Sequence, residues 1–247
     1  MTTICIATLK GGQGKTFISA LLCRELSKEG RVLAVSICSQ NDINLYLGSS
    51  INSYQLYQAI DENNIKKSIV NTKFKNIDLV PYDINDSLNV DKLLQTITGG
   101  EFRLKTLLKQ ISDIYDYVIL DTGPNLNIST TGAIIASNYL ISPTLMRWSS
   151  INGYIATSNA LNDLIDLEFS NCKHLGIIRS QTNVLRDSET FEVEDYINDE
   201  HIAELGSIPS STALKRALYE YSDFDKVRPH HMSEVKKLFD NIKTKIL

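Results

Sequence analysis

Lys10-Gly11-Gly12-Gln13-Gly14-Lys15-Thr16 is a glycine-rich stretch that joins an apolar run, residues 4–7, to a segment with apolar side chains at helical spacing, residues 17–22. A strand, a glycine loop and a helix in this order make a cradle for phosphate groups. The glycines let backbone N–H groups approach an anion closely, and the helix adds its positive N-terminal end. Lys15 is placed to reach the β- and γ-phosphates of ATP, and the Thr16 hydroxyl to ligate Mg²⁺. This context favours a nucleotide site over a glycine-rich turn with solvated lysines.

The stretch departs from the usual phosphate-binding loop at its start. Leu9 stands where the first glycine is expected, and Lys10 adds a second lysine. Lys-Gly-Gly-x-Gly-Lys-Thr resembles the deviant P-loop of the ParA/MinD group of ATPases, and most of all the ParA/Soj-type partition ATPases without an N-terminal helix-turn-helix domain. The resemblance continues at the second strand, the Walker B strand and switch loop, the strand after it and the start of the base-binding loop: residues 31–35, 115–124, 136–143 and 208–209.

The resemblance implies the residues of an ATP and Mg²⁺ site. Lys10 would cross into a partner subunit and touch its nucleotide, so that two subunits enclose two ATP molecules. Lys10, Lys15 and Asp121 are then the catalytic residues, and Thr16 and Asp121 hold Mg²⁺. The nucleotide contacts are expected at the loop, the next side chain and two residues near the base: Gly11, Gly12, Gln13, Gly14, Lys15, Thr16, Phe17, Gln181 and Pro209. We also expect Ser180 near the base, and Tyr219 and Tyr221 stacked at the adenine edge.

Asp121 ends an apolar strand. A carboxylate at such a place loses hydration unless it has a partner, and the water shell of Mg²⁺ near Thr16 supplies one. The alternative is an acid that caps the next turn, with Gly123-Pro124 ending the strand. The phosphate cradle upstream favours the metal role.

The segment after the second strand lacks two carboxylates that the resemblance leads us to expect. The family usually has Asp-x-Asp-Pro-Gln there, whereas this chain has Ser36-Ile37-Cys38-Ser39-Gln40. A serine and a thiol cannot orient or deprotonate water as a carboxylate does, and the loss of such a group lowers a rate by about 10²–10⁴. We therefore expect slow hydrolysis. Asp42 is either a substitute acid or a loop and helix-capping residue. Cys38 is either a redox-active thiol or, as is more common, a small buried one.

Short β-branched runs alternate with helical periodicity along the chain. This pattern predicts an α/β fold, a doubly wound, mostly parallel twisted sheet with helices on both faces, in one domain that spans residues 1–247. A polar segment, residues 84–100, is expected to be a connecting loop with a short helix. The expected strands lie at about 3–8, 32–37, 77–81, 116–121, 138–143, 174–179 and 203–208.

Composition limits the classes of partner and compartment. The 25 Lys and Arg against 29 Asp and Glu give a net charge of −4, so attraction to DNA or anionic lipid needs a local patch. The four cysteines show no C-x-x-C spacing, which indicates a reducing compartment and no metal cage. Without a signal peptide or an 18-residue apolar run, we expect a cytoplasmic protein that does not bind a membrane. The resemblance to ParA implies that it is associated with the nucleoid.

Three features offer partner surfaces. Lys215 and Arg216 begin a helix at a place where the family carries DNA-contacting residues, and Lys236 and Lys237 are expected to add to that patch. The helix near residues 235–246 is either a basic membrane anchor, as in the MinD branch, or the last core helix, which we favour. Arg147 and Trp148 are either a partner contact or half-buried packing.

The combined prediction is a ParA-like switch that forms an ATP-bound homodimer, holds DNA non-specifically and recruits a ParB-like or cargo-adaptor protein to partition or position a large cargo. The alternatives are an ATP-locked scaffold that does not hydrolyse its nucleotide, and a MinD-like protein at a membrane. A redox relative such as the nitrogenase iron protein is nearly excluded, because no cysteine occurs between Cys38 and Cys172.

Overall fold

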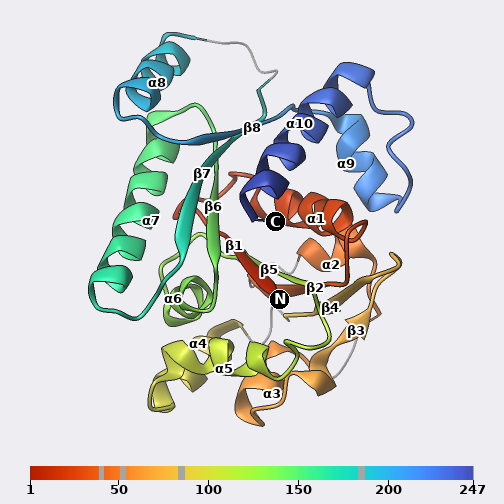
Figure 1. The fold of residues 1–247 in the computed structure, drawn as a ribbon, viewed down its shortest axis with the longest axis vertical. Coiled ribbons are helices and arrows are strands. Elements are labelled where there is room, and N and C mark those ends of the chain that lie inside the picture. The colour runs from red at the N-terminus through yellow and green to blue at the C-terminus, as the bar shows by residue number, and fades with distance from the viewer. Residues whose placement is uncertain (39–41, 51–53, 83–86, 183–186, 247) are drawn as a thin grey trace.

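The computed structural model describes residues 1–38, 42–50, 54–82, 87–182 and 187–246 (Figure 1). Its strands are β1 (Thr2–Ile6), β2 (Val32–Ile37), β3 (Val70–Asn71), β4 (Ile77–Val80), β5 (Tyr117–Thr122), β6 (Tyr139–Thr144), β7 (Lys173–Ser180) and β8 (Glu204–Ile208). They form an eight-stranded sheet in the order β3-β4-β2-β5-β1-β6-β7-β8. All neighbours are parallel except β3, which runs antiparallel to β4.

The helices connect these strands. They are α1 (Lys15–Leu26), α2 (Asp42–Leu47), α3 (Leu56–Asp61), α4 (Ser87–Thr96), α5 (Arg103–Lys109), α6 (Ile128–Ile135), α7 (Trp148–Asp166), α8 (Ser188–Asp199), α9 (Thr212–Tyr219) and α10 (Pro229–Ile246), with short 3₁₀ turns η1 (Lys66–Ser68) and η3 (Gly100–Phe102). None of the helices in the described ranges is long and apolar enough to cross a membrane.

Alternate residues of each central strand point to opposite faces of the sheet, and helices cover both faces, so both sets of side chains are buried. Ile4 and Ile6 of β1 pack into a core with α1, α2, α9 and α10. Cys5 of β1 and Leu33 of β2 pack into a second core with α3 to α7. Figure 1 shows these two groups of helices on opposite sides of the sheet. The expected α/β fold with a doubly wound, mostly parallel sheet is confirmed.

The seven expected strands are present, with ends that differ by a few residues. The sequence analysis missed β3, a two-residue antiparallel edge strand. Its length explains this, because two residues cannot show an alternating pattern. The expected helix within residues 84–100 is α4, while residues 83–86 lie outside the described part.

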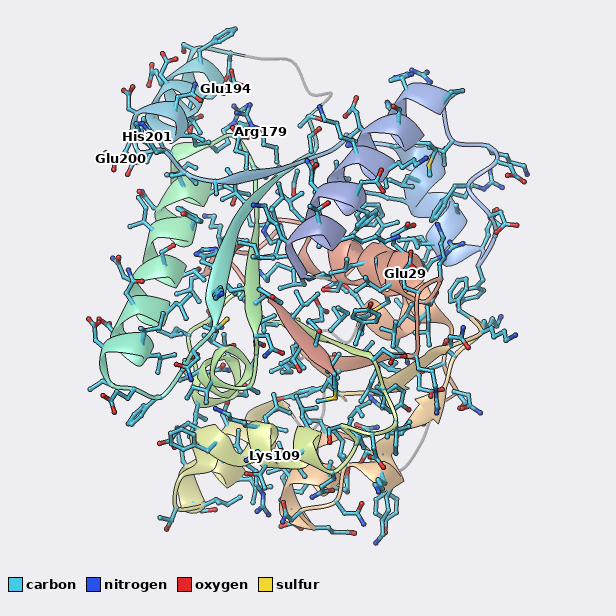
Figure 2. All side chains as sticks on the ribbon, viewed as in Figure 1. Glu29, Lys109, Arg179, Glu194, Glu200 and His201 are labelled. Carbon is cyan, nitrogen blue, oxygen red and sulfur yellow. The ribbon has the colours of Figure 1, made fainter. Side chains whose placement is uncertain are left out.

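The C-terminal helix α10 is a core helix. Its apolar side chains, among them Val235, Leu238 and Phe239, are buried against β8 and α1. The approach to β8 is close, since a Cβ added at Gly206 would lie 3.2 Å from the Leu238 Cα. Lys243 fixes the end of the helix through ion pairs of 2.9 Å to Glu25 of α1 and 2.8 Å to Glu29, which follows that helix and is labelled in Figure 2. The favoured core packing is therefore observed, and the apolar face is not exposed as a membrane anchor would require.

Candidate nucleotide site

A cavity of about 320 Å³ lies at the carboxyl ends of β1, β2, β5, β7 and β8. Ligands of open α/β sheets bind at this edge, where successive loops converge. The loop after β1 contributes residues 11–16, and the other strand ends contribute Cys38, Thr122, Ser180 and residues 208–210. The sheet thus brings together segments that are up to two hundred residues apart in the sequence.

The glycine loop has the backbone shape of a phosphate cradle. Gly12 and Gly14 have φ angles of 75° and 81°, in the left-handed region that favours glycine. A Cβ at Gly11 or Gly12 would meet nothing within 4 Å, so these residues face open space. Gly14 is the N-cap of α1 and supplies no side chain to cap it. The amide groups at the start of α1 are therefore left for a ligand such as a phosphate.

Lys15 is folded onto its own loop. Its Nζ donates to the carbonyl oxygens of Thr8 at 3.1 Å and Lys10 at 2.8 Å. Burial lowers the pKa of Lys15, while the charge of Asp121 acts in the opposite direction. A cation held only by neutral carbonyls would gain strongly from an anionic ligand. The lysine is thus poised to exchange these carbonyls for phosphate oxygens.

Asp121 is fully buried at the end of β5. Ser19 Oγ donates to its Oδ1 at 2.9 Å, whereas Oδ2 has no hydrogen-bond partner among the described residues. Burial raises the pKa of Asp121 to about 6, and the Ser19 hydrogen bond, the nearby Thr16 hydroxyl and the charge of Lys15 oppose this shift. The orphaned oxygen, with Thr16 close by, fits a hydrated Mg²⁺ ion, which prefers a few carboxylate and hydroxyl ligands alongside water and phosphate.

The loop is fixed by contacts from other strands. Gln13, predicted as a nucleotide contact, donates through Nε2 to the Gly11 carbonyl at 3.0 Å and accepts through Oε1 from the Leu145 N–H at 2.9 Å. Ser180 Oγ at the end of β7 donates to the Gln13 carbonyl at 2.8 Å. The Gln13 side chain therefore shapes the loop from within, although the residue also lines the cavity.

The segment that lacks the expected carboxylates borders the same cavity. Ser36 is buried and donates to the Cys38 carbonyl at 3.3 Å. Cys38 and Asp42 both line the cavity, and Asp42 is the first residue of α2. Ser39 and Gln40 lie outside the described residues. Asp42 is therefore the acid of this segment that the structure places at the site, while it also begins a helix, so both expectations for it stay open.

The aromatic candidates differ in their positions. Phe17 lines the cavity and packs edge-on against Tyr46, at 6.0 Å between ring centroids. Tyr46 also lines the cavity and contacts the tilted ring of Tyr219 at 4.8 Å between centroids, whereas Tyr219 is not part of the lining. Tyr221 instead packs against Phe74, at 6.1 Å. Stacking of Tyr219 and Tyr221 on adenine is not supported, because Tyr46 is the tyrosine that borders the cavity.

The remaining site residues divide into those inside and outside the cavity. Gln181 and Pro209 line it, as expected of residues near the base, and Gln181 has a left-handed φ of 58°. Lys10 is exposed and does not belong to the lining. Within the described ranges, no cluster of three or more His, Cys, Asp or Glu side chains forms a metal site by itself.

The four basic residues predicted for DNA are not alike. Lys215 lines the nucleotide cavity. Arg216 is exposed but pairs with Glu220 at 2.5 Å. Lys236 and Lys237 are exposed on α10. Lys236 also borders a second hollow, of about 500 Å³, whose basic lining includes Arg24 and Lys28 and whose acidic lining includes Glu25 and Asp223.

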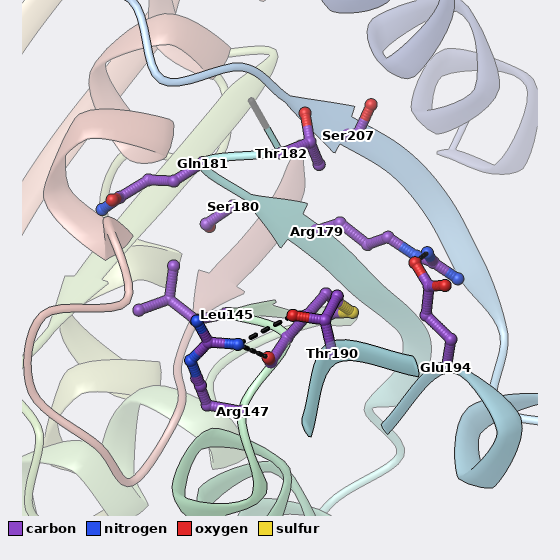
Figure 3. A pocket seen from close by; sticks show the side chains of 10 residues that line it. Leu145, Arg147, Arg179, Ser180, Gln181, Thr182, Thr190, Glu194 and Ser207 are labelled. Atoms are coloured by element: carbon purple, nitrogen blue, oxygen red, sulfur yellow. Dashed lines mark hydrogen bonds and ion pairs between the residues drawn. The ribbon is translucent and has the colours of Figure 1, made fainter. Parts of the chain in front are cut away.

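A third cavity, of about 380 Å³, adjoins the nucleotide cavity at Ser180 and Gln181. Figure 3 shows its two arginines against side chains of α8. Arg179 contacts Glu194 at 2.7 Å, and Arg147 contacts Thr190 at 2.8 Å and Asp187 at 2.9 Å. The two arginines of this cavity are thus already paired with acidic or hydroxyl side chains among the described residues. Arg147 is also the N-cap residue of α7.

Trp148 packs against α8 with part of its surface exposed. Its ring lies edge-on to Tyr196 at 5.3 Å between centroids, and its Nε1 donates to Glu192 at 3.3 Å. This is the half-buried packing that the sequence left as one alternative, and the partner contact is untested.

Sequence reasoning missed two hydroxyl groups at the site. Ser19 lies one helical turn after Lys15 and bonds both its carbonyl oxygen and Asp121. Its spacing within α1 could have indicated a residue facing the same strand. Thr157, on α7, accepts from the Leu9 N–H at 3.0 Å. No local pattern pointed to Thr157, because it lies 148 residues from its partner.

Comparison with known proteins points to one group. A family model described as an AAA domain matches residues 1–174. The virulence plasmid ParA family protein pGP5-D of Chlamydia psittaci is 33% identical over 147 residues, which is 57% of this chain and 56% of that protein. This match and those to two other curated relatives, proteins of Methanocaldococcus jannaschii and Myxococcus xanthus, span 46% to 62% of the relatives' own length.

Two solved structures share the fold over nearly the whole chain. A Cyanothece McdA variant in complex with ATP has a TM-score of 0.88 and 23% identity, and the match covers 98% of this chain and 96% of the other. A protein described as a plasmid partition protein from Borrelia burgdorferi B31, bound to AMPPNP, has a TM-score of 0.81 and 25% identity over 99% of both chains. Both were solved with an adenine nucleotide or its analogue.

Proposed function

This chain belongs to the ParA-like P-loop ATPases, a family of partition and positioning proteins, and from that premise we propose that it is an ATP-driven dimerisation switch. The observation that carries the proposal is the cavity at the sheet edge, which Lys15 and a loop with two left-handed glycines line and beside which Asp121 lies buried with one oxygen unpartnered among the described residues. ATP would occupy it with Mg²⁺.

Binding would rearrange the loop's own contacts. The Lys15 ammonium exchanges two carbonyl oxygens for phosphate oxygens. Thr16 and Asp121 would hold Mg²⁺, which when bound offsets negative charge on the phosphate oxygens. Gln181 and Pro209, which share the cavity, would border the base.

Dimerisation follows from the charge that remains. A triphosphate carries more negative charge than Lys15 and one Mg²⁺ ion offset, and Lys10 is exposed outside the cavity of its own subunit. We infer that Lys10 reaches the nucleotide of a second copy, so that each subunit completes the other's site. ADP lacks the γ-phosphate and gives Lys10 less to bind, which makes the dimer depend on ATP.

Hydrolysis would be slow. No carboxylate stands at Ser36 or Cys38 to orient water, and Asp42 is the nearest acid that borders the cavity. Single-turnover release of γ-phosphate tests this step. Release at the rate of dimer dissociation supports a switch, and no release over hours supports an ATP-locked scaffold, the second candidate that Ser36 and Cys38 favour.

The ATP dimer would hold DNA non-specifically and recruit a ParB-like or cargo-adaptor protein at the nucleoid. Two copies double a weak patch, which raises affinity through simultaneous contacts. Lys236 and Lys237 are the better supported part of that patch, because both are exposed on α10 whereas Arg216 is paired with Glu220.

Co-sedimentation with DNA and with anionic liposomes tests whether the ATP dimer binds DNA or a membrane. We expect DNA binding in the presence of ATP that falls steeply with salt, and no liposome binding. Lys236→Ala with Lys237→Ala should weaken DNA binding more than Arg216→Ala does. Binding to liposomes but not to DNA would favour the MinD-like alternative.

A further inference from the structure

The backbone just before the glycines is held against α7. The Leu9 N–H donates to Thr157 Oγ1 at 3.0 Å, and that hydroxyl donates to the Gly153 carbonyl oxygen at 2.7 Å. Thr157 is completely buried. Its hydroxyl therefore uses its donor within the helix and offers its acceptor to the loop, which joins the two elements through a buried side chain.

Gly153 lets the helix approach Lys10 closely. A Cβ added at this position would lie 2.9 Å from the Lys10 Cβ and 3.2 Å from the Leu9 carbonyl oxygen. Both atoms belong to the backbone or to the root of a side chain, so neither can yield by a simple rotation. Any larger residue must displace either α7 or the loop.

The Lys10 backbone has two further contacts. Its N–H donates to the Thr8 carbonyl oxygen at 2.7 Å, and its own carbonyl accepts from Lys15 Nζ at 2.8 Å. Thr8 in turn is buried and donates through Oγ1 to the Pro143 carbonyl oxygen at 2.7 Å. Lys10 thus combines a fixed backbone with an exposed side chain.

We propose that Gly153 and Thr157 are positioning residues that set the place of Lys10 for its contact with the second subunit's nucleotide. The inference rests on the proposed function, in which Lys10 completes the partner's site. A lysine on a fixed backbone loses less conformational freedom when it binds than one on a mobile loop. A displacement of about 1 Å of a positioned group can lower a reaction rate by up to about 10²-fold.

The first test is Gly153→Ala. We expect its ATP-dependent dimerisation constant, measured by sedimentation equilibrium with ATP and Mg²⁺, to weaken about 10-fold or more. Affinity for ADP, which reports on the monomer's own cavity, should stay within about threefold of the parent chain, because the atoms nearest to an added Cβ belong to Leu9 and Lys10, which precede the glycines.

The second test separates the hydroxyl from the shape of the side chain. Thr157→Val keeps the shape but leaves the Leu9 N–H without its acceptor, and it should weaken the dimer as Gly153→Ala does. Thr157→Ser keeps the hydroxyl and should dimerise as the parent chain does. A merely structural role for Thr157 would instead show as equal losses in the dimerisation constant and ADP affinity.

A matched control is Gly132→Ala in α6. Its Cβ would lie 2.9 Å from the Glu101 carbonyl oxygen, a similar crowding far from Lys10 in the sequence. We expect this variant to lower the melting temperature without a selective loss of the dimer.

The outcomes separate this inference from the proposed function. If the parent chain forms no ATP dimer, or if Lys10→Ala leaves the dimer intact, the proposed function fails. If the parent dimer depends on Lys10 but Gly153→Ala and Thr157→Val dimerise within about twofold of the parent, or lose ADP affinity in parallel, the positioning role is wrong.

Discussion

Ser19 Oγ donates a hydrogen bond to Asp121 Oδ1 over 2.9 Å, while Oδ2 of the same carboxylate is buried with no hydrogen-bond partner in the part of the chain that the structure describes. Half of the carboxylate is therefore satisfied and half is left for a ligand. A protein that had only to be stable would not keep such a group, because a buried unsatisfied charge costs free energy. Such an oxygen is what the proposed magnesium site requires.

Asp121→Asn should stabilise the nucleotide-free protein at pH 7.5. Burial raises the pKa of Asp121 to about 6, so the folded state is destabilised by the charged form above that pH. The neutral amide removes this cost, which amounts to about 1–3 kcal/mol. Urea unfolding measures the gain, and the same variant should lose the extra stability that Mg²⁺ with ATP gives the parent chain. A variant less stable than the parent that still responds to Mg²⁺ would contradict the assignment.

Lys15→Met should weaken ATP binding by about 10- to 100-fold, the range expected for the loss of charge-assisted hydrogen bonds. The folded loop loses only two bonds to carbonyl oxygens, so the fold should persist. Calorimetric titration measures the change. Lys28→Met is the matched control, because Lys28 lies near the end of the same helix in an exposed pair with Glu25. An equal loss of ATP affinity in the two variants would show that Lys15 does not contact the nucleotide.

Cys38→Asp should increase single-turnover phosphate release by about 10²-fold, because it restores a carboxylate at the border of the cavity. Cys38→Ser serves as the control for the loss of the thiol alone and should leave the rate unchanged. A companion variant, Asp42→Asn, tests the substitute acid. If Asp42→Asn leaves the residual rate intact, Asp42 is a helix-starting residue and nothing more.

His174 should make stability depend on pH. Ser142 Oγ donates to the Ala7 carbonyl oxygen and thus accepts from His174 Nε2, and the Ser158 hydroxyl donates to Nδ1. Burial lowers the pKa of His174 to about 4, so the folded state holds the neutral ring. In the unfolded chain, the imidazole of His174 is protonated near pH 6.5.

The contribution of neutral His174 to the free energy of unfolding is therefore complete above pH 6.5. It is lost as the pH falls towards 4, by about 3 kcal/mol in total. Urea unfolding of the parent and of His174→Gln between pH 7.5 and 4.5 checks this. The variant should be less stable at pH 7.5, and the difference should shrink as the pH falls. Parallel curves would show that His174 does not titrate in this range.

The fold was largely predictable because its signals are local. Most of the parallel strands are short apolar runs with β-branched residues, and the glycine loop between β1 and α1 indicates at which edge of the sheet the cavity lies. The edge strand β3 was missed, because two residues that pair with β4 carry no periodic signal. That residues 1–247 form a single domain stays a prediction.

The site was predictable in its anchors and less so in its supports. Lys15, Thr16, Gln181 and Pro209 line one cavity, and Asp121 lies buried beside it, as the motif and the strand order require. Tyr46 was missed and Tyr219 and Tyr221 were favoured instead, because tertiary packing alone decides which tyrosine faces the cavity.

The predicted DNA patch also shows that tertiary contacts cannot be read from the sequence. Lys215 and Arg216 are neighbours in the sequence, yet one lines the nucleotide cavity and the other pairs with Glu220. Charge along a sequence indicates where a cation is, but the pairing that removes its effect appears only in three dimensions.

The most direct measurement is the molecular mass in solution of the parent chain and of Lys10→Ala, each with ADP, with ATP and with a slowly hydrolysed ATP analogue, all with Mg²⁺. We expect a dimer of the parent with the two triphosphates, a monomer with ADP, and a monomer of Lys10→Ala under every condition. A parent chain that stays monomeric with ATP, or a Lys10→Ala variant that dimerises as the parent does, would contradict the claim that Lys10 joins two subunits through their nucleotides.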